Sequence, residues 1–218
     1  MNRRELFTSL GRGSTVTEPC IEISGPSRFT NALLTTHNGE QVRFYDDMIK
    51  GKQVIVNMMY ADCESACPRI TSRLVQVHEE LKARMGRDLF MYSITMKPET
   101  DDAAALKNFA EMHGAIKPGW TFLTGDAYDL ETIRFALFRM NHIKFDSDLA
   151  SHTGMLRIIN DKTNCWTCVP PLASMYTVLQ HIGWADPPLT YRERQAESRR
   201  KQRMINEEVA KYGYRKIV

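Results

Sequence analysis

The stretch Val54–Pro68 constrains the fold of this 218-residue chain more than any other. It opens with an apolar run, Val54–Met59, which is rich in large and β-branched residues and too short for a buried helix. Because its apolar residues do not alternate with polar ones, the run is typical of a strand that is covered on both faces of a sheet. After this run, a helix is expected to begin near Cys67-Pro68, because proline is favoured in the first turn of a helix. We therefore predict a central strand whose C-terminal end meets a ligand or reactant.

Two cysteines, Cys63 and Cys67, stand at this strand end. Residues four apart share one face of a helix, so the two sulfur atoms can converge if the helix begins between them. The helix N-terminus favours the thiolate forms of both side chains. The carboxylates of Asp62 and Glu64 flank Cys63 and act against its thiolate form, so they predict a raised pKa for Cys63. The same carboxylates attract a cation. The pair suits a soft metal ion or a disulfide, and the acidic neighbours favour metal capture over fast thiol exchange.

Strand and helix patterns alternate along the rest of the chain, with a hairpin expected at Asn38-Gly39. In the helix that follows Pro68 we expect His78 to be exposed to solvent. Strands are predicted at 32–36, 41–44, 89–95, 120–125 and 153–160, and helices at 70–85, 100–113, 130–140, 172–182 and 191–212. The fold class is therefore α/β: a central mixed sheet flanked by helices, with antiparallel pairing where the connections are short.

Composition divides the chain into three parts. Residues 1–28 form an N-terminal arm or linker, because Gly, Ser, Thr and Pro accumulate there without periodicity. Residues 29–186 form the folded domain, and residues 187–218 form a charged helical C-terminal extension that begins with Pro187-Pro188. The extension holds nine Lys/Arg against four Asp/Glu, while the rest of the chain holds 20 against 22. We thus expect no nucleic-acid partner for the domain, and a protein partner or second copy for residues 189–218.

The N-terminus contains Arg3-Arg4, which resembles the start of a twin-arginine export signal. No apolar region of about 7–15 residues follows it, as such a signal needs. No stretch approaches the about 18 apolar residues of a membrane span, so we expect no transmembrane segment. The five cysteines are too few and too scattered for a disulfide scaffold.

Four landmarks occur in a set order along the chain. They are Cys63-x-x-x-Cys67-Pro68, Pro98-Glu99-x-Asp101, Trp120-x-x-Leu123-Thr124-Gly125 and Ser151-His152-Thr153. In order and spacing, over about residues 33–183, they resemble the Sco/SenC family of copper-binding proteins. The resemblance implies a thioredoxin-like sandwich that binds one copper ion, Cu⁺ or Cu²⁺, through Cys63, Cys67 and His152.

What such proteins do is also implied by the resemblance. They are metallochaperones or assembly factors for the copper site of cytochrome oxidase, or thiol reductants for it, so the expected partner is a copper-receiving protein or an oxidase subunit. The implied location is periplasmic or extracytoplasmic. Because the N-terminus lacks an apolar region, a cytoplasmic location or export together with a partner stays open.

Two positions depart from the family pattern. Lys97 stands where an aspartate is usual, and Ser151 stands where an acidic residue often precedes the histidine. Neither is an expected copper ligand. The departures therefore concern the electrostatics of the site and the docking surface, and hence the partner, more than the metal.

The chemistry of the three side chains agrees with copper. Two thiolates and an imidazole form a soft three-coordinate set that suits Cu⁺, whereas structural zinc requires four protein ligands. Two other functions stay open: a thiol–disulfide oxidoreductase that uses Cys63 and Cys67, and a non-catalytic docking subunit of a larger complex. The oxidoreductase is disfavoured by the three-residue spacing of the cysteines, and by Ser-His-Thr where thioredoxins have a cis-proline.

A second pair, Cys165 and Cys168, lies in a segment expected to be a stiff exposed loop. The strand that follows His152 carries the chain about 25 Å away, so this pair should not share the first metal. Three interpretations stay open. The two cysteines form a second redox pair, they form half of a zinc site that is completed by residues such as Cys20 or His181, or they are two loop thiols without a function. The sequence does not decide among these three.

Overall fold

The computed structural model of the chain describes residues 29–138, 155–186 and 191–212. Seven strands form one sheet: β1 (Leu33–Thr36), β2 (Gln41–Arg43), β3 (Gln53–Met59), β4 (Leu89–Thr95), β5 (Trp120–Gly125), β6 (Leu156–Asn160) and β7 (Cys165–Val169). The helices are α1 (Ala66–Glu80), α2 (Ala103–Met112), α3 (Ala127–Phe138), α4 (Met175–Trp184) and α5 (Tyr191–Tyr212), with a π-helical turn at Phe44–Ile49.

The sheet is mixed, with the strand order β2-β1-β5-β4-β3-β6-β7. Strands β3, β4 and β5 are parallel, whereas β1 pairs antiparallel with β2 and β5, and β6 pairs antiparallel with β3 and β7. The predicted hairpin is formed by β1 and β2, and Gly39 adopts the positive φ of 82° that such a turn needs. The predicted α/β class, a mixed sheet flanked by helices, is confirmed.

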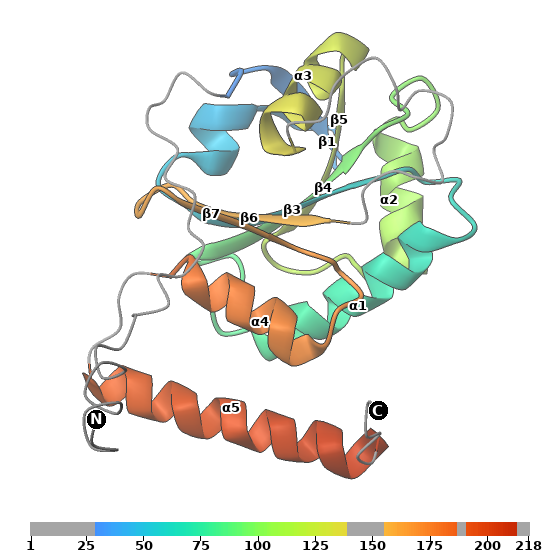
Figure 1. Ribbon diagram of the computed structural model, residues 1–218. Coiled ribbons are helices and arrows are strands. Elements are labelled where there is room, and N and C mark those ends of the chain that lie inside the picture. The colour runs from blue at the N-terminus through green and yellow to red at the C-terminus, as the bar shows by residue number, and fades with distance from the viewer. Residues whose placement is uncertain (1–28, 139–154, 187–190, 213–218) are drawn as a thin grey trace, which may run out of the picture.

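Helices cover both faces of this sheet (Figure 1). One face packs against α1, α2 and α4, and the other packs against α3 and the π-helical turn. Strand β3 is buried along its entire length, and its side chains contribute alternately to the two cores, with Ile55 in one and Val56 in the other. The prediction of a central strand covered on both faces is confirmed.

Polar side chains link three strands inside the first of these cores. Trp120 Nε1 donates to Ser93 Oγ at 3.0 Å, and Ser93 Oγ donates to Asn57 Oδ1 at 2.8 Å. Asn57, the one polar residue within β3's apolar run, is thereby paired although it is 4% exposed. Buried polar groups are costly when unpaired, so this chain of hydrogen bonds explains how an asparagine is accommodated in the central strand.

The prediction that His78 is exposed to solvent was wrong. The residue was expected to be exposed on α1, but it is 4% exposed, and its Nε2 lies 2.9 Å from the carbonyl oxygen of Pro118. Its ring stacks on Trp120, with 6.4 Å between the centroids. The buried face of α1 is therefore wider than the apolar spacing indicated.

Two glycines let the loop after α1 meet the start of β5 at very short range. A Cβ atom added to Gly119 would lie 2.2 Å from the backbone nitrogen of Gly86. Gly119 also has a φ of 72°, which L-residues with a side chain rarely adopt. Only glycine fits at position 119.

The charged helix predicted over 191–212 is present as α5. In Figure 1 it lies beyond α4, on the side away from the sheet. Arg200 Nη2 donates to the carbonyl oxygen of Glu80 at 2.9 Å, which ties α5 to the end of α1. No helix among the described residues has the length and apolar character needed to cross a membrane.

Candidate metal and thiol site

The two motif cysteines flank the junction between β3 and α1. Helix α1 begins at Ala66, between them, so Cys63 precedes the helix and Cys67 lies in its first turn. The backbone N–H of Cys67 donates to Cys63 Sγ at 3.3 Å, and the two thiols are hydrogen-bonded to each other. Both side chains are buried, Cys63 with 5% and Cys67 with 2% of their surface exposed. The sulfur atoms therefore converge at the C-terminal end of the central strand.

The two thiols differ strongly in acidity. Burial raises the pKa of Cys63, but hydrogen bonds from the backbone of Cys67 and Ser65, the Cys67 thiol and the Tyr60 hydroxyl outweigh it and lower the pKa to about 6. Burial raises the pKa of Cys67 to about 12, and the neighbouring Cys63 adds to the rise. At neutral pH, the pair is thus one thiolate and one thiol.

The prediction of a raised pKa for Cys63 was wrong. Its premise was that Asp62 acts on Cys63 as a bare negative charge, but Lys97 Nζ binds both carboxylate oxygens of Asp62 at 3.0 Å. The backbone amides at the start of α1 then decide the sign, because they stabilise the thiolate directly. No sequence pattern gave the pairing of Asp62 with a residue 35 positions away.

Tyr60 contacts both Cys63 and Lys97. The Tyr60 hydroxyl hydrogen-bonds to Cys63, and with burial this raises the pKa of Tyr60 to about 12. The Lys97 ammonium lies 4.3 Å from the centroid of the Tyr60 ring, a cation–π contact. Sequence reasoning assigned no role to Tyr60, whose only signal was its place just after the central strand. Lys97, one of the two departures from the family pattern, therefore contacts two residues next to the cysteine, Asp62 and Tyr60.

Asp101 anchors the loop that carries Cys63. Its carboxylate, 2% exposed, accepts from the Ala61 backbone N–H at 2.9 Å and from Thr95 Oγ1 at 2.6 Å. The cap of the following helix, α2, is the neighbouring Asp102, which accepts from Ala105 N at 2.8 Å. This releases Asp101 to hold the β3–α1 loop, which accounts for the Pro98-Glu99-x-Asp101 landmark.

The third predicted ligand, His152, lies outside the described residues. Among the described residues, no group of three or more His, Cys, Asp or Glu side chains is placed to hold a metal ion. The described part of the site therefore offers two sulfur donors, Cys63 and Cys67. Two soft donors suit a soft, low-coordinate ion better than structural zinc.

The acidity of Cys63 leads to a first prediction. The iodoacetamide reaction rate of Cys63 should rise with pH and level off at about pH 7–8, because the thiolate fraction saturates one to two pH units above the lowered pKa of about 6. An ordinary thiol levels off only above about pH 9. Peptide mapping by mass spectrometry across pH 4–10 checks this, with the free Cys168 as internal control. A Cys63 profile that still climbs between pH 8 and 10 would contradict the hydrogen bonding described here.

The two members of the second cysteine pair lie on opposite faces of the sheet. Cys165 and Cys168 lie on β7, three residues apart, so their side chains point to opposite faces. Cys165 packs in the core beside α4 and is disulfide-bonded, whereas Cys168 is free and partly exposed. The expected exposed loop is instead a strand, and its Trp166 is 5% exposed and stacks on Phe29 at 4.8 Å. A redox or zinc pair formed by Cys165 with Cys168 is not compatible with this arrangement.

His181, suggested as a further ligand for that pair, has another role. Its Nδ1 lies 2.8 Å from Thr167 Oγ1, and its ring contacts Trp184 at a centroid distance of 4.3 Å. Burial lowers the pKa of His181. His181 is a half-buried residue that joins α4 to β7.

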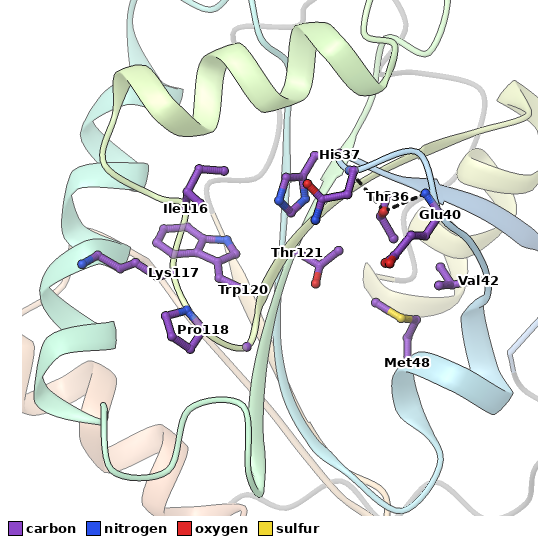
Figure 2. A pocket seen from close by; sticks show the side chains of 12 residues that line it. Thr36, His37, Glu40, Val42, Met48, Ile116, Lys117, Pro118, Trp120 and Thr121 are labelled. Atoms are coloured by element: carbon purple, nitrogen blue, oxygen red, sulfur yellow. Dashed lines mark hydrogen bonds between the residues drawn. The ribbon is translucent and has the colours of Figure 1, made fainter.

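A pocket of about 480 Å³ lies at the other end of the sheet (Figure 2). It is lined by the start of β5 and the end of β1, and the parallel strands put it opposite the strand end that bears the cysteines. Figure 2 shows His37, Trp120 and Ile116 on one side of it, and Glu40 and Met48 on the other. The cysteine site is therefore not part of this pocket.

Comparison with known proteins gives consistent matches. A family model described as SCO1/SenC matches residues 27–185. The SCO1 protein homolog of Bacillus subtilis is 27% identical over 104 residues, which are 48% of this chain; the match spans about half, 53%, of that relative's length.

Two solved structures have the same fold. One is BsSco, which its description calls a member of the Sco family of cytochrome c oxidase assembly proteins. It has a TM-score of 0.59 and 20% identity, over 76% of this chain and 98% of BsSco. The other is yeast Sco1 with copper bound, with a TM-score of 0.55 and 17% identity, over 75% of this chain and 98% of yeast Sco1. At these identities the structures establish the thioredoxin-like fold.

Proposed function

This chain belongs to the SCO1/SenC family, and we propose that it is a copper-binding protein of Sco type that acts as a metallochaperone or assembly factor for a respiratory copper enzyme. The ligands we propose are the sulfur atoms of Cys63 and Cys67 and the imidazole of His152. The observation that carries the proposal is the convergence of the two sulfur atoms, with Cys67 N–H bonded to Cys63 Sγ at 3.3 Å, at the end of a fully buried strand.

The local chemistry supports copper as cargo. A thiolate at Cys63 is already formed near neutral pH, so only Cys67 must lose its proton when the ion binds. The ion's charge supplies the free energy for that deprotonation.

One observation favours a second candidate, thiol–disulfide exchange. A nucleophilic cysteine with a low pKa beside a protonated partner is the arrangement that exchange requires, and Cys63 and Cys67 have pKa values of about 6 and about 12. The low exposure of Cys63, 5%, and the Tyr60 hydroxyl on its sulfur oppose fast attack on a protein disulfide. We therefore rank it second.

His152 separates the two candidates, and this is our second prediction. For a copper carrier, His152→Ala should shift or remove the thiolate charge-transfer bands of the Cu²⁺ form and its nitrogen coupling in electron paramagnetic resonance, because the nitrogen ligand is lost. An exchanger should keep its insulin reductase activity within about threefold in the same variant. His181→Ala is the matched histidine control. Identical spectra in wild type and His152→Ala, together with high reductase activity, would reverse our ranking.

The partner and location follow from the same proposal. BsSco is described as an assembly protein of cytochrome c oxidase, and we propose that the recipient here is likewise a copper-bearing oxidase subunit or a related copper-receiving protein. We place the protein on the extracytoplasmic side of the membrane, where the Sco/SenC resemblance implies that copper insertion takes place.

A further inference from the structure

A hollow of about 400 Å³ lies beside the cysteine site, along the outer face of α1. We call it the α1 groove, and it is lined by Pro68, Arg69, Ser72, Arg73, Gln76 and Leu172. The first five residues come from α1, between Pro68 and Gln76, and Leu172 comes from the connection between β7 and α4. Because Pro68 directly follows Cys67, the groove begins where the cysteine site ends.

The charge of the groove is positive and uncompensated. Arg69 is exposed and Arg73 is half-buried, and within the described residues neither has a carboxylate partner. The two carboxylates that α1 does carry, Glu79 and Glu80, lie at its other end and are engaged by Lys117 and Arg200. The groove thus holds two guanidinium groups on one helix face, four residues and about 6 Å apart along the axis.

The groove also offers apolar and neutral polar contacts. Leu172 has 44% of its surface exposed, and it stands after Pro170-Pro171, which stiffens the loop. Ser72 and Gln76 are exposed on the same helix face as the arginines and can hydrogen-bond a peptide backbone. Arginine beside exposed apolar side chains is the composition of protein–protein interfaces rather than of solvated helix faces.

From these features we propose that the α1 groove docks an acidic segment of a partner protein. The segment carries carboxylates that pair with Arg69 and Arg73, and an apolar side chain that packs on Leu172 and Pro68. Two carboxylates at alternate positions of an extended chain are about 6.6 Å apart, which matches the arginine spacing. The proposal rests on the proposed function in one respect: a partner seated in the groove lies next to Cys67, as transfer of copper or electrons requires.

The test uses the full chain and a short synthetic peptide with Glu at alternate positions and Leu between them. Isothermal titration should show binding that weakens about tenfold or more in the double variant Arg69→Glu/Arg73→Glu. The matched control is Lys82→Glu/Lys107→Glu, which changes the net charge equally at exposed sites outside the groove and should bind within about twofold of wild type. The peptide with Gln in place of Glu should bind the wild type about tenfold more weakly.

Several results would overturn the proposal. Equal losses in both double variants would show that net charge alone acts. Absence of peptide binding to the wild type, whether or not phosphatidylserine vesicles bind through the arginines, would remove the acidic peptide as the occupant. A dimer that dissociates in Arg69→Glu/Arg73→Glu would make the groove a contact between copies. Copper content, measured on the same samples, should be unchanged by either double variant, so failure of copper binding and failure of docking are read separately.

Discussion

Replacing Cys63 or Cys67 with serine is expected to abolish stoichiometric copper binding. Changes to groups behind metal ligands already weaken affinity by about 10–100-fold, and removing a thiolate ligand should exceed that range, a loss of about a hundredfold or more. A serine hydroxyl is a hard, neutral donor that does not replace a thiolate for a soft ion. Metal analysis of protein purified anaerobically, after copper loading and desalting, measures the effect.

Cys168→Ser is the control for this experiment, because Cys168 is also a free cysteine but lies on β7, away from the β3–α1 junction. It should retain one copper per chain. Cys67 is 2% exposed, so Cys67→Ser also buries a hydroxyl, and Cys67→Ala with a thermal melt separates misfolding from ligand loss. Unchanged copper content in folded Cys63→Ser would remove the proposed function.

The second large effect is expected at Gly119, where alanine should lower the free energy of unfolding by about 3 kcal/mol or more. About 1 kcal/mol comes from placing a side chain at a φ of 72°. The remainder comes from the clash of the new Cβ with the Gly86 backbone, at 2.2 Å, which only movement of the main chain can relieve. Chemical denaturation of the two proteins provides the measurement.

Gly114→Ala measures the backbone part of this effect alone, so its difference from Gly119→Ala gives the steric part. Gly114 has a φ of 65°, close to that of Gly119, but a Cβ there would meet nothing within 4 Å. The control variant should therefore lose only about 1 kcal/mol. If both variants lost the same amount, the close approach of Gly119 to Gly86 would not be a constraint on this fold.

How far the sequence predicts this fold depends on how local the signal is. The apolar run of β3, the Asn38-Gly39 turn and the spacing of α1 are local patterns, and each produced the element expected. The exposure of His78 was mispredicted because its partner, the Pro118 carbonyl, comes from a loop 40 residues away. The segment of Cys165 and Cys168 was mispredicted for a similar reason: β7 is held by its pairing with β6 and by Trp166 stacked on Phe29.

The candidate site divides in the same way. The spacing of Cys63 and Cys67 predicts that a helix begins between them, and in the structure α1 begins there, at Ala66. The acidity of Cys63 depends on hydrogen bonds from the backbone amides of Cys67 and Ser65, from the Cys67 thiol and from the Tyr60 hydroxyl. Such contacts form only in the folded chain, so the sequence pattern assigned the wrong sign to the pKa shift.

The position of the two cysteines has a consequence for the lifetime of the protein in the cell. Cys63 and Cys67 are held by the most enclosed strand and by a helix packed on it, so the pair has this geometry only while the domain is folded. A ligand that binds only the folded chain stabilises it, by about 2.7 kcal/mol when its free concentration is a hundred times the dissociation constant. A carrier that has delivered its copper is then the less stable form, and quality-control proteases, which degrade chains that unfold more often, should remove it before the loaded form. The abundance of such a carrier would follow the supply of its cargo without any dedicated regulator.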